Sequence, residues 1–372
     1  MADREARFAG EDQVTFTELR KQREEERARL IRDGIIDDPD KPVTLEHAKV
    51  LVGTCMDMCP RFEREERQFQ NAVDKVEKDP ITGRIDPRLA VKAYHRPAAG
   101  VPNPMPSDVR PPKVLVKTLD YLFHDLLTKY PFVEVHPFIR DRTRSVRADF
   151  RVQNSDGPEC IESHERIIRF HILAIHLLTA ESGFSAQQEM QQLRASMAAL
   201  MDMYRSSRQR GIVPEHEAEF VAYRAFAFPD EPQEYMWLDD RTPSIVKTSS
   251  RMLGMVRTGD AKIFTIISQR RIPYLLACML EPLFWDLRQR QLVGLNNKTF
   301  SRKVKFLTLE YVAEVLCLNS AEEARRFIEF YGLEVVENPA GGRYIAPKLR
   351  IDSKISQFAR RPVVNEYTSI KT

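Results

Sequence analysis

The feature that most limits how this chain can fold is a long series of helical apolar periodicities through residues 160–292. The first segment, Ile161 to Leu178, is apolar on both sides of a helix, so neighbouring helices must cover both sides. Ser185 and Gln188 then form a capping box at the start of the next helix. Antiparallel helices joined by short turns predict a stacked, tetratricopeptide-like layer and an all-α fold class.

The C-terminal part changes this pattern. Thr308 and the capping box Ser320–Glu323 mark the starts of two helices, and Gly332 marks the end of the second. Two short strand-forming segments follow, separated by a turn that contains Pro339. Helices followed by a β-hairpin predict a winged helix over residues 293–355.

Charged residues dominate residues 1–50. Thr17 to Asp33 predicts a mixed-charge helix with little apolar face, which favours a partly disordered arm followed by a turn-rich linker. The alternative is that this helix docks on a partner through its few apolar side chains, Phe16, Leu19 and Leu30.

Residues 51–159 predict an N-terminal helical region with one extended insertion. Pro60 suits the first turn of a helix. The predicted inward stripe of that helix is Phe62, Phe69, Val73 and Val76. The prolines between Ala90 and Pro112 exclude a helix interior, so we expect this segment to follow the domain surface in an extended path. The helical period returns from Lys113 to Lys129, and a polar tail over residues 356–372 ends the chain.

Cys55 and Cys59 flank Asp57 in an unusual string, Gly53 to Glu63. A Cys-x-x-x-Cys pair is compatible with half of a zinc site, but no second pair of cysteines follows at a suitable spacing. Cysteine is also among the residue types most often buried. Packing is therefore the preferred interpretation, and no metal or cofactor is predicted.

A second unusual string places Arg140, Arg144, Arg147 and Arg151 on one face of a predicted helix. One interpretation is a phosphate-binding face. The other is a set of buried arginine–carboxylate pairs, in which Asp141, Asp149 and the acidic residues between 57 and 66 take the guanidinium groups.

Composition excludes several classes of protein. The net charge of +3 is nearly neutral, so any affinity for nucleic acid must come from a local patch. No apolar run approaches a membrane span, and the charged start is not a signal peptide. Five cysteines in such a chain favour reduced thiols in the cytosol or nucleus. Phosphate loops, metal-ligand spacings and nucleophile elbows are absent from the sequence, so an enzyme is not expected.

The last predicted helix is acidic, with Glu322, Glu323 and Glu329, which disfavours docking in a DNA groove. Basic residues gather before this helix and on the predicted wing instead. They are Lys298, Arg302, Lys303, Lys305, Arg343, Lys348 and Arg350. Brought together by the fold, they would make a sequence-independent edge for phosphates. The alternative is that they are ordinary solvated charges.

Four strings occur in a fixed order: Gly53 to Glu63, Ala90 to Gly100, Pro106 to Pro112, and Arg140 to Arg147. Together they resemble the central region of the germinal-centre-associated nuclear protein (GANP, or SAC) family over residues 50–350. The residues that carry this structural motif are Cys55, Asp57, Cys59, Arg96, Arg142, Arg144 and Arg147.

The resemblance implies a helical region ending in a winged helix, the proteasome–COP9–initiation-factor (PCI) arrangement. It implies a non-catalytic scaffold of the second transcription-and-export complex, nuclear and associated with the nuclear pore, which exports messenger RNA. The winged helix would pair with a PCI-domain subunit braced by a small acidic DSS-type subunit. Partner contacts would fall on Arg325, Arg326, Phe330 and Tyr344.

The paired winged helices would bind single-stranded RNA, with DNA as an alternative, through the basic residues given above. The N-terminal arm would contact an RNA-helicase-type ATPase. Family members carry further N- and C-terminal elements, so the chain is expected to be a central fragment or a shorter paralogue. Two alternatives stay open: a PCI-type subunit of another assembly, and a stand-alone winged-helix nucleic-acid-binding regulator.

Overall fold

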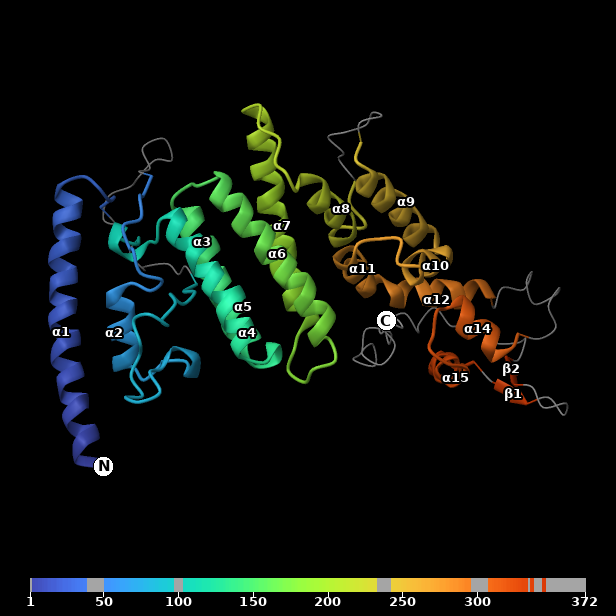
Figure 1. Ribbon diagram of the computed structural model, residues 1–372, viewed down its shortest axis with the longest axis horizontal. Helices are drawn as coiled ribbons and strands as arrows, with labels where there is room; N and C mark the ends of the chain where they lie inside the picture. The colour runs from blue at the N-terminus through green and yellow to red at the C-terminus, as the bar shows by residue number, and fades with distance from the viewer. Residues whose placement is uncertain are drawn as a thin grey trace. The chain divides into compact units, whose positions relative to one another are not determined.

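The computed structural model divides into two compact units, Met1–Ile167 and Ile168–Thr372 (Figure 1). It describes residues 2–38, 50–96, 103–232, 242–295, 307–333, 335–337 and 343–345. Nearly all regular structure in these residues is helical, which confirms the predicted all-α class. None of the described helices has the length and apolar character needed to cross a membrane.

In the residues that the structure describes, unit 1 contains five helices of its own and the first half of a sixth. They are α1 (Ala2–Arg32), α2 (Arg61–Phe69), α3 (Pro112–Asp120), α4 (Leu127–Lys129), α5 (Phe132–Val152) and α6 (Pro158–Leu178). A π-helical turn, Tyr121–Leu126, joins α3 to α4, so the helix expected from Lys113 to Lys129 is confirmed. Pro60 and Pro131 precede the first turns of α2 and α5, where a missing backbone N–H costs nothing.

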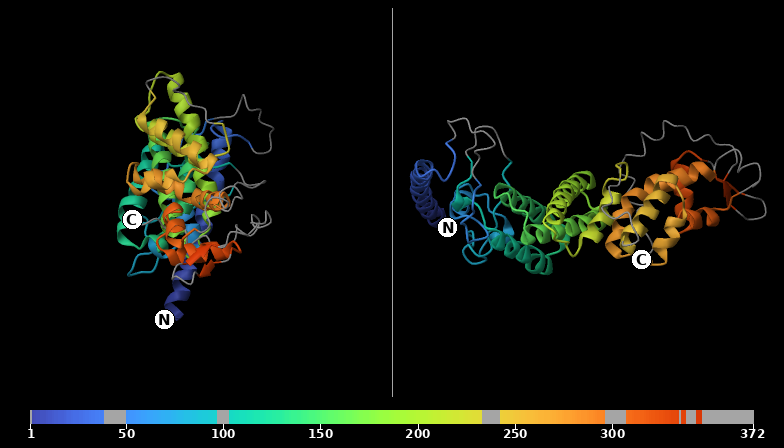
Figure 2. Two further views of the ribbon diagram at one scale, coloured as in Figure 1. Left: turned by 90° about the vertical axis from the view of Figure 1, so that its right-hand side faces the viewer. Right: turned by 90° about the horizontal axis from the view of Figure 1, so that it is seen from above.

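The N-terminal helix α1 lies beside α2 (Figure 1, Figure 2). The ring of Phe16 stacks on Phe69 with 5.0 Å between centroids and lies 5.6 Å from Phe62. Arg23 reaches further and donates to both carboxylate oxygens of Asp108, at 2.5 and 2.7 Å.

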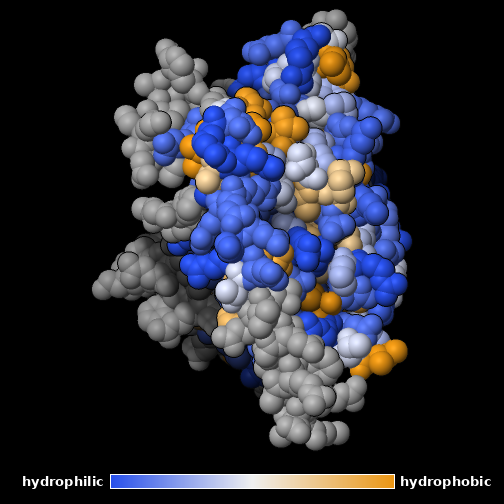
Figure 3. All heavy atoms as spheres, turned by 90° about the vertical axis from the view of Figure 1, so that its left-hand side faces the viewer, coloured by the Kyte–Doolittle hydropathy of each residue, from blue (hydrophilic) through white to orange (hydrophobic). Residues whose placement is uncertain are grey.

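These contacts correct the expectation of a partly disordered arm over residues 16–32. The predicted anchors do dock, but on this chain itself. The helix is mostly polar, yet the ring of Phe16 and the two hydrogen bonds of Arg23 hold it in place. At its C-terminal end Leu30 is buried against Ile36 and Met105. Hydrophilic side chains cover most of the described surface seen in Figure 3, and hydrophobic ones form separate patches.

The proline-rich segment also departs from expectation. Its described ends are interior, because Ala90, Val91, Met105, Val109 and Arg110 are all fully buried. A short 3-10 turn, Pro106–Asp108, lies between them. The segment therefore forms part of the inside of unit 1 where it is described, and residues 97–102 lie outside the described residues.

After the second half of α6, the described part of unit 2 consists mainly of helices joined by short segments of chain. They are α7 (Ala186–Gln209), α8 (Glu217–Ala227), α9 (Ser244–Thr258), α10 (Lys262–Ser268), α11 (Tyr274–Leu280), α12 (Phe284–Leu295), α14 (Leu309–Val315) and α15 (Ala321–Phe330). Within this unit α8 packs against α7, α9 and α11. Two short strands, β1 (Val335–Glu337) and β2 (Arg343–Ile345), pair antiparallel with Val336 opposite Tyr344.

The predicted helix starts in unit 2 are confirmed by their caps. The Ser185 hydroxyl accepts a hydrogen bond from the backbone N–H of Gln188 at 3.3 Å. The Ser320 hydroxyl accepts from the N–H of Glu323 at 3.1 Å, and Thr308 caps α14 in the same way. Each cap satisfies a backbone donor that the helix itself leaves open.

Candidate functional site

A buried network of arginines and carboxylates occupies the centre of unit 1. Glu77 is fully buried at the end of a 3-10 turn, Lys75–Glu77. One of its carboxylate oxygens accepts from Arg67 at 2.5 Å and from Arg142 at 3.2 Å. The other accepts from the backbone N–H of Val91 at 2.9 Å. Burial alone lowers the pKa of Arg67, but its hydrogen bond to Glu77 and the charges around it raise that pKa above the usual value.

Asp149 on α5 is the second centre of the network. Its carboxylate accepts from Lys92 at 2.6 Å and from Nε of Arg110 at 2.7 Å. The fully buried Arg110 guanidinium also donates to the Ser145 hydroxyl at 2.7 Å and to the carbonyl of Met58 at 3.2 Å. These bonds join α5 to the chain segments on either side of the proline-rich insertion.

The Gly53–Glu63 string is held against the same centres. The N–H of Gly53 donates to the side-chain oxygen of Gln153 at 3.0 Å. A Cβ at position 53 would lie 2.5 Å from the carbonyl oxygen of Val109, so only glycine fits there. Asp57 pairs with Arg64 at 2.8 Å. Further along, Glu63 accepts from the N–H of Ala93 at 2.7 Å.

The structure thus brings together all four strings that carry the family resemblance. Residues 53–63 contact residues 92–93 and 109–110, Glu77 contacts Val91, and α5 supplies Arg142, Asp149 and Gln153. The hypothesis of arginine–carboxylate pairs concerns Arg140, Arg144, Arg147 and Arg151, and the pairs found here belong to their neighbour Arg142, which binds both Asp141 and Glu77. The carboxylates of Glu77 and Asp149 each accept several hydrogen bonds, whereas Nε of Arg67 and Nε of Arg142 are buried without a hydrogen-bond partner among the described residues. The bonds that form join distant segments, so this network fixes the path of the chain.

The two cysteines of the string are buried, as packing predicts. The Cys59 sulfur accepts from Arg67 at 3.3 Å, and burial raises the pKa of its thiol well above the usual value. The Cys55 thiol donates to the carbonyl of Asp57, and burial raises its pKa too. In the described residues, no group of three His, Cys, Asp or Glu side chains could hold a metal.

The remaining motif arginines lie outside the two centres. The Arg144 guanidinium lies 4.0 Å from the centroid of the Tyr94 ring, in a cation–π contact. Arg96 is exposed at the end of the described segment, and Arg147 is half-buried on α5. The predicted arginine face therefore mixes a ring contact with partly exposed charges, and its buried neighbour Arg142 joins the network.

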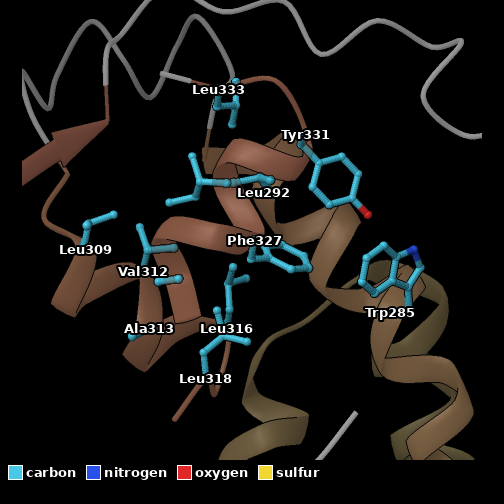
Figure 4. Packing of buried hydrophobic residues seen from close by; sticks show 12 residues of the cluster. Trp285, Leu292, Leu309, Val312, Ala313, Leu316, Leu318, Phe327, Tyr331 and Leu333 are labelled. Atoms are coloured by element: carbon cyan, nitrogen blue, oxygen red, sulfur yellow. The ribbon is translucent and has the colours of Figure 1, made fainter. Parts of the chain in front are cut away.

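The C-terminal module, comprising α12, α14, α15, β1 and β2, is a second candidate site. Phe327 lies between the aliphatic residues of α14 and the ring of Trp285 on α12 (Figure 4). The Trp285 and Phe327 rings meet edge to face at 5.6 Å. Arg288, buried on α12, donates to the carbonyls of Leu316 and Cys317 at 2.9 Å each, which satisfies the C-terminal end of α14.

The predicted partner residues occupy different positions in this module. Arg326 is exposed on α15, and Arg325 pairs with Glu329 at 2.8 Å on the solvent side. Phe330 is half-buried, with its ring 5.6 Å from Trp285, so it belongs partly to the module's own core. Tyr344 lies on β2 opposite Val336, and its side chain is outside the described residues.

The predicted nucleic-acid residues Lys298, Arg302, Lys303 and Lys305 lie outside the described residues, as do Lys348 and Arg350. Of this set only Arg343 is placed, by its backbone, on β2 opposite Glu337. Sequence reasoning missed Glu77 and Arg288, since a single buried charge in a loop or on an apolar helix leaves no periodic signal.

A buried histidine in unit 1 gives a pH-dependent prediction. Burial lowers the pKa of His164 to about 4, while its hydrogen bond with the carbonyl of Cys160 opposes this and the positive charges of Arg147 and Arg151 add to it. In the unfolded chain a histidine titrates near 6.5, at about its unperturbed pKa. As the pH falls below that value, the unfolded chain gains a proton that the folded chain does not take, so stability is lost.

We expect the wild type to lose about 2 kcal/mol more than His164→Gln between pH 7 and pH 5 in denaturant unfolding. The substitution removes only this titration, because the acidic groups are common to both proteins. An equal loss in both proteins would contradict the neutral state of His164.

The fold is that of a helical protein with an interlocked network of buried ion pairs in unit 1. Comparison with known proteins identifies its family. The model of the SAC3/GANP family matches residues 58–337. SAC3 family protein 1 of Schizosaccharomyces pombe is 39% identical over 348 residues, covering 87% of this chain and 34% of that protein. This chain belongs to the SAC3/GANP family.

Two other relatives are more distant. SAC3 family protein B of Arabidopsis thaliana is 32% identical over 68% of this chain and 16% of its own length. Protein xmas of Drosophila melanogaster is 27% identical over 91% of this chain and 17% of its own length. The chain therefore spans about a third or less of each of these relatives.

Proposed function

We propose that this chain is the scaffold region of a nuclear messenger-RNA-export complex that couples transcription to export. The observation that carries the proposal is the family match over residues 58–337, which includes both the arginine network and most of the C-terminal module. The network supports a scaffold role, because interlocked buried ion pairs hold a surface in one arrangement. Location in the nucleus, at the nuclear pore, is part of the same proposal.

We further propose that the C-terminal module is a winged helix. Three helices, α12, α14 and α15, contribute to one apolar core, and β1 pairs with β2 directly after them. This order of helices and paired strands is the one that a winged helix requires. The helical layer from α6 to α12 would then be the PCI-type repeat region of the scaffold.

The surface of α15 favours a protein partner. It exposes Arg326 together with Glu322 and Glu329, and such mixed charge suits a complementary protein face better than a row of phosphates. The proposed partner is a PCI-domain subunit braced by a small acidic DSS-type subunit. Single-stranded RNA would bind the basic edge of Lys298, Arg302, Lys303 and Lys305 with residues of β2 and beyond.

The pairing is tested by purifying the chain from nuclear extract and identifying its partners by mass spectrometry. Arg325→Glu with Arg326→Glu reverses charge on the exposed side of α15 and leaves the core intact. Arg205→Glu is the matched control, because Arg205 is an exposed arginine on α7. We expect a PCI-domain subunit and a small acidic subunit with the wild type and the control, and neither of them with the double variant.

Retention of both subunits by the double variant would contradict the assignment of α15. Phe330→Asp is a poorer probe, because its ring contacts Trp285 and the change would also disturb the module. A chain that elutes alone yet binds duplex DNA would favour the winged-helix regulator instead. The proposed contact of α1 with an RNA-helicase-type ATPase is tested separately: unchanged ATP turnover on adding the chain would contradict it.

A further inference from the structure

The turn after α10 places an arginine in the left-handed conformation, which glycines adopt after α9 and α15 and which Asn71, Asn154 and Cys317 adopt after other helices. Arg270 has a φ of 52°, in the left-handed region. Helices α9 and α15 are followed in this conformation by Gly259 and Gly332, with φ of 75° and 72°. Glycine adopts this region without a steric cost, whereas the Cβ of an arginine crowds the following carbonyl. The arginine at this turn therefore costs stability, and such strain in an exposed turn favours a functional role.

The sequence around Arg270 is basic, and the nearest carboxylates along the chain are Asp260 and Glu281. Residues 261–280 contain Lys262, Arg270 and Arg271 and no aspartate or glutamate. All three cations are exposed. Lys262, Thr265 and Gln269 share one exposed helical face by their spacing, and this face leads to Arg270. Tyr274, at the start of α11, is 55% exposed, an unusual exposure for a large aromatic side chain.

The ordinary role of cations at a helix end does not account for these residues. Arg290 has that role at the end of α9, where it donates to the carbonyl of Arg257 at 3.0 Å. Arg257 donates to the carbonyl of Pro229, after the end of α8, at 2.7 Å. Neither Arg270 nor Arg271 makes a side-chain hydrogen bond or an ion pair within the described part of the chain. Their guanidinium groups face solvent.

We propose that this surface, the α10 track of Lys262, Gln269, Arg270, Arg271 and Tyr274, is a second binding site for single-stranded RNA. The cations take successive phosphates, and the exposed ring of Tyr274 stacks on a base. Positive charge with an adjacent aromatic ring suits a flexible single strand of any sequence. The inference rests on the proposed function in taking RNA as the ligand, but it concerns other residues than the basic edge of Lys298, Arg302, Lys303 and Lys305.

The variant Arg270→Gly distinguishes a structural role of Arg270 from a role in binding RNA. It relieves the left-handed strain, so we expect a higher melting temperature together with weaker binding of a fluorescent oligouridine. The slope of log affinity against log salt should become shallower by about 0.7 for each phosphate of a single strand that the variant no longer neutralises. Arg270→Gly with Arg271→Ala should therefore lower the slope by about 1.4. Tyr274→Ala should weaken binding about tenfold with the slope unchanged.

Two control variants are available in the full-length chain. Asn154→Gly relieves the same conformation, at a φ of 48°, without removing a charge. Arg205→Ala removes an exposed charge from α7 without touching the α10 track. Both are expected to bind oligouridine as the wild type does. The proposal would be overturned if the Arg270→Gly variant melts at a higher temperature but keeps the affinity and salt slope of the wild type. It would also be overturned if the wild type does not bind oligouridine.

A parallel variant keeps this proposal distinct from the basic edge. Alanine at Lys298, Arg302, Lys303 and Lys305 tests that edge alone. If these changes abolish binding and the α10 variants have no effect, the second site is wrong and the proposed function stands. If the α10 variants alone weaken binding, the second site stands and the basic edge is wrong. Subunit pairing is judged independently, by co-purification.

Discussion

Glu77→Gln is expected to lower the free energy of unfolding of unit 1 by about 3 kcal/mol, among the largest effects of any single polar substitution in this chain. Glu77 is fully buried and is the common acceptor for Arg67 and Arg142. Glutamine keeps the shape but removes the charge, and its amide group presents hydrogen-bond donors to two guanidinium groups. Two buried cations then share weaker acceptors.

Denaturant unfolding followed by circular dichroism measures this decrease. Glu134→Gln is the matched control, because its partner Lys75 is 67% exposed and water screens the pair, so the change is expected to have little effect on stability. A Glu77 variant as stable as the control would mean that the network does not hold unit 1 together.

Trp285→Ala is expected to destabilise the C-terminal module by about 3–5 kcal/mol. The indole on α12 contacts the rings of Phe327, Phe330 and Tyr331 on and after α15. Its removal leaves a cavity where α12 meets α15. Hydrogen exchange should therefore accelerate throughout α14 and α15, while α2 and α5 in unit 1 keep their protection.

Tyr311→Ala is the control for this prediction. Tyr311 is an aromatic residue of α14 but is 42% exposed, so its removal should change exchange in the module little. Unchanged protection of α15 in Trp285→Ala would contradict the picture of one core shared by α12, α14 and α15. Co-purification of the PCI-type subunit with this variant would then report on pairing without a folding defect.

Helices and their starts were predictable from the sequence because they depend on local chemistry. The caps at Ser185, Thr308 and Ser320 form as their spacing indicates, since a hydroxyl three residues before a free N–H reaches it in any protein. The burial of Cys55 and Cys59 followed in the same way from residue type.

The inward face of α2 could not be predicted this way. The expected stripe included Phe62 and Phe69, but the structure buries Glu63, Arg64 and Arg67 and leaves Phe69 44% exposed. Apolar periodicity assumes that charge faces water, and that assumption fails where distant segments supply opposite charges. The partners of this face lie at Glu77, Val91 and Ala93, which no local pattern connects to it.

In the candidate sites too, contacts with a local sequence signal could be predicted and contacts between distant segments could not. The arginine–carboxylate interpretation of residues 140–151 could be made because arginines and carboxylates occur both in this segment and in the Gly53–Glu63 string. Arg110, fully buried in the interior, could not be assigned a partner, since nothing in the sequence links it to Asp149. The strain at Arg270 is likewise invisible in the sequence, because it is a property of the backbone at one turn.

The arginine network also has a consequence for the order in which the chain can fold during synthesis. Glu77 and Arg142 are 65 residues apart, and Gly53 and Gln153 are 100 apart. Domains form from the N-terminus as the chain leaves the ribosome, but closing such long loops is slow. Lys92 and Arg110, which precede α5, lack the carboxylate of Asp149 until that helix emerges. Unit 1 is therefore expected to stay open to chaperones and proteases for most of its own translation, and then to close in a single late step.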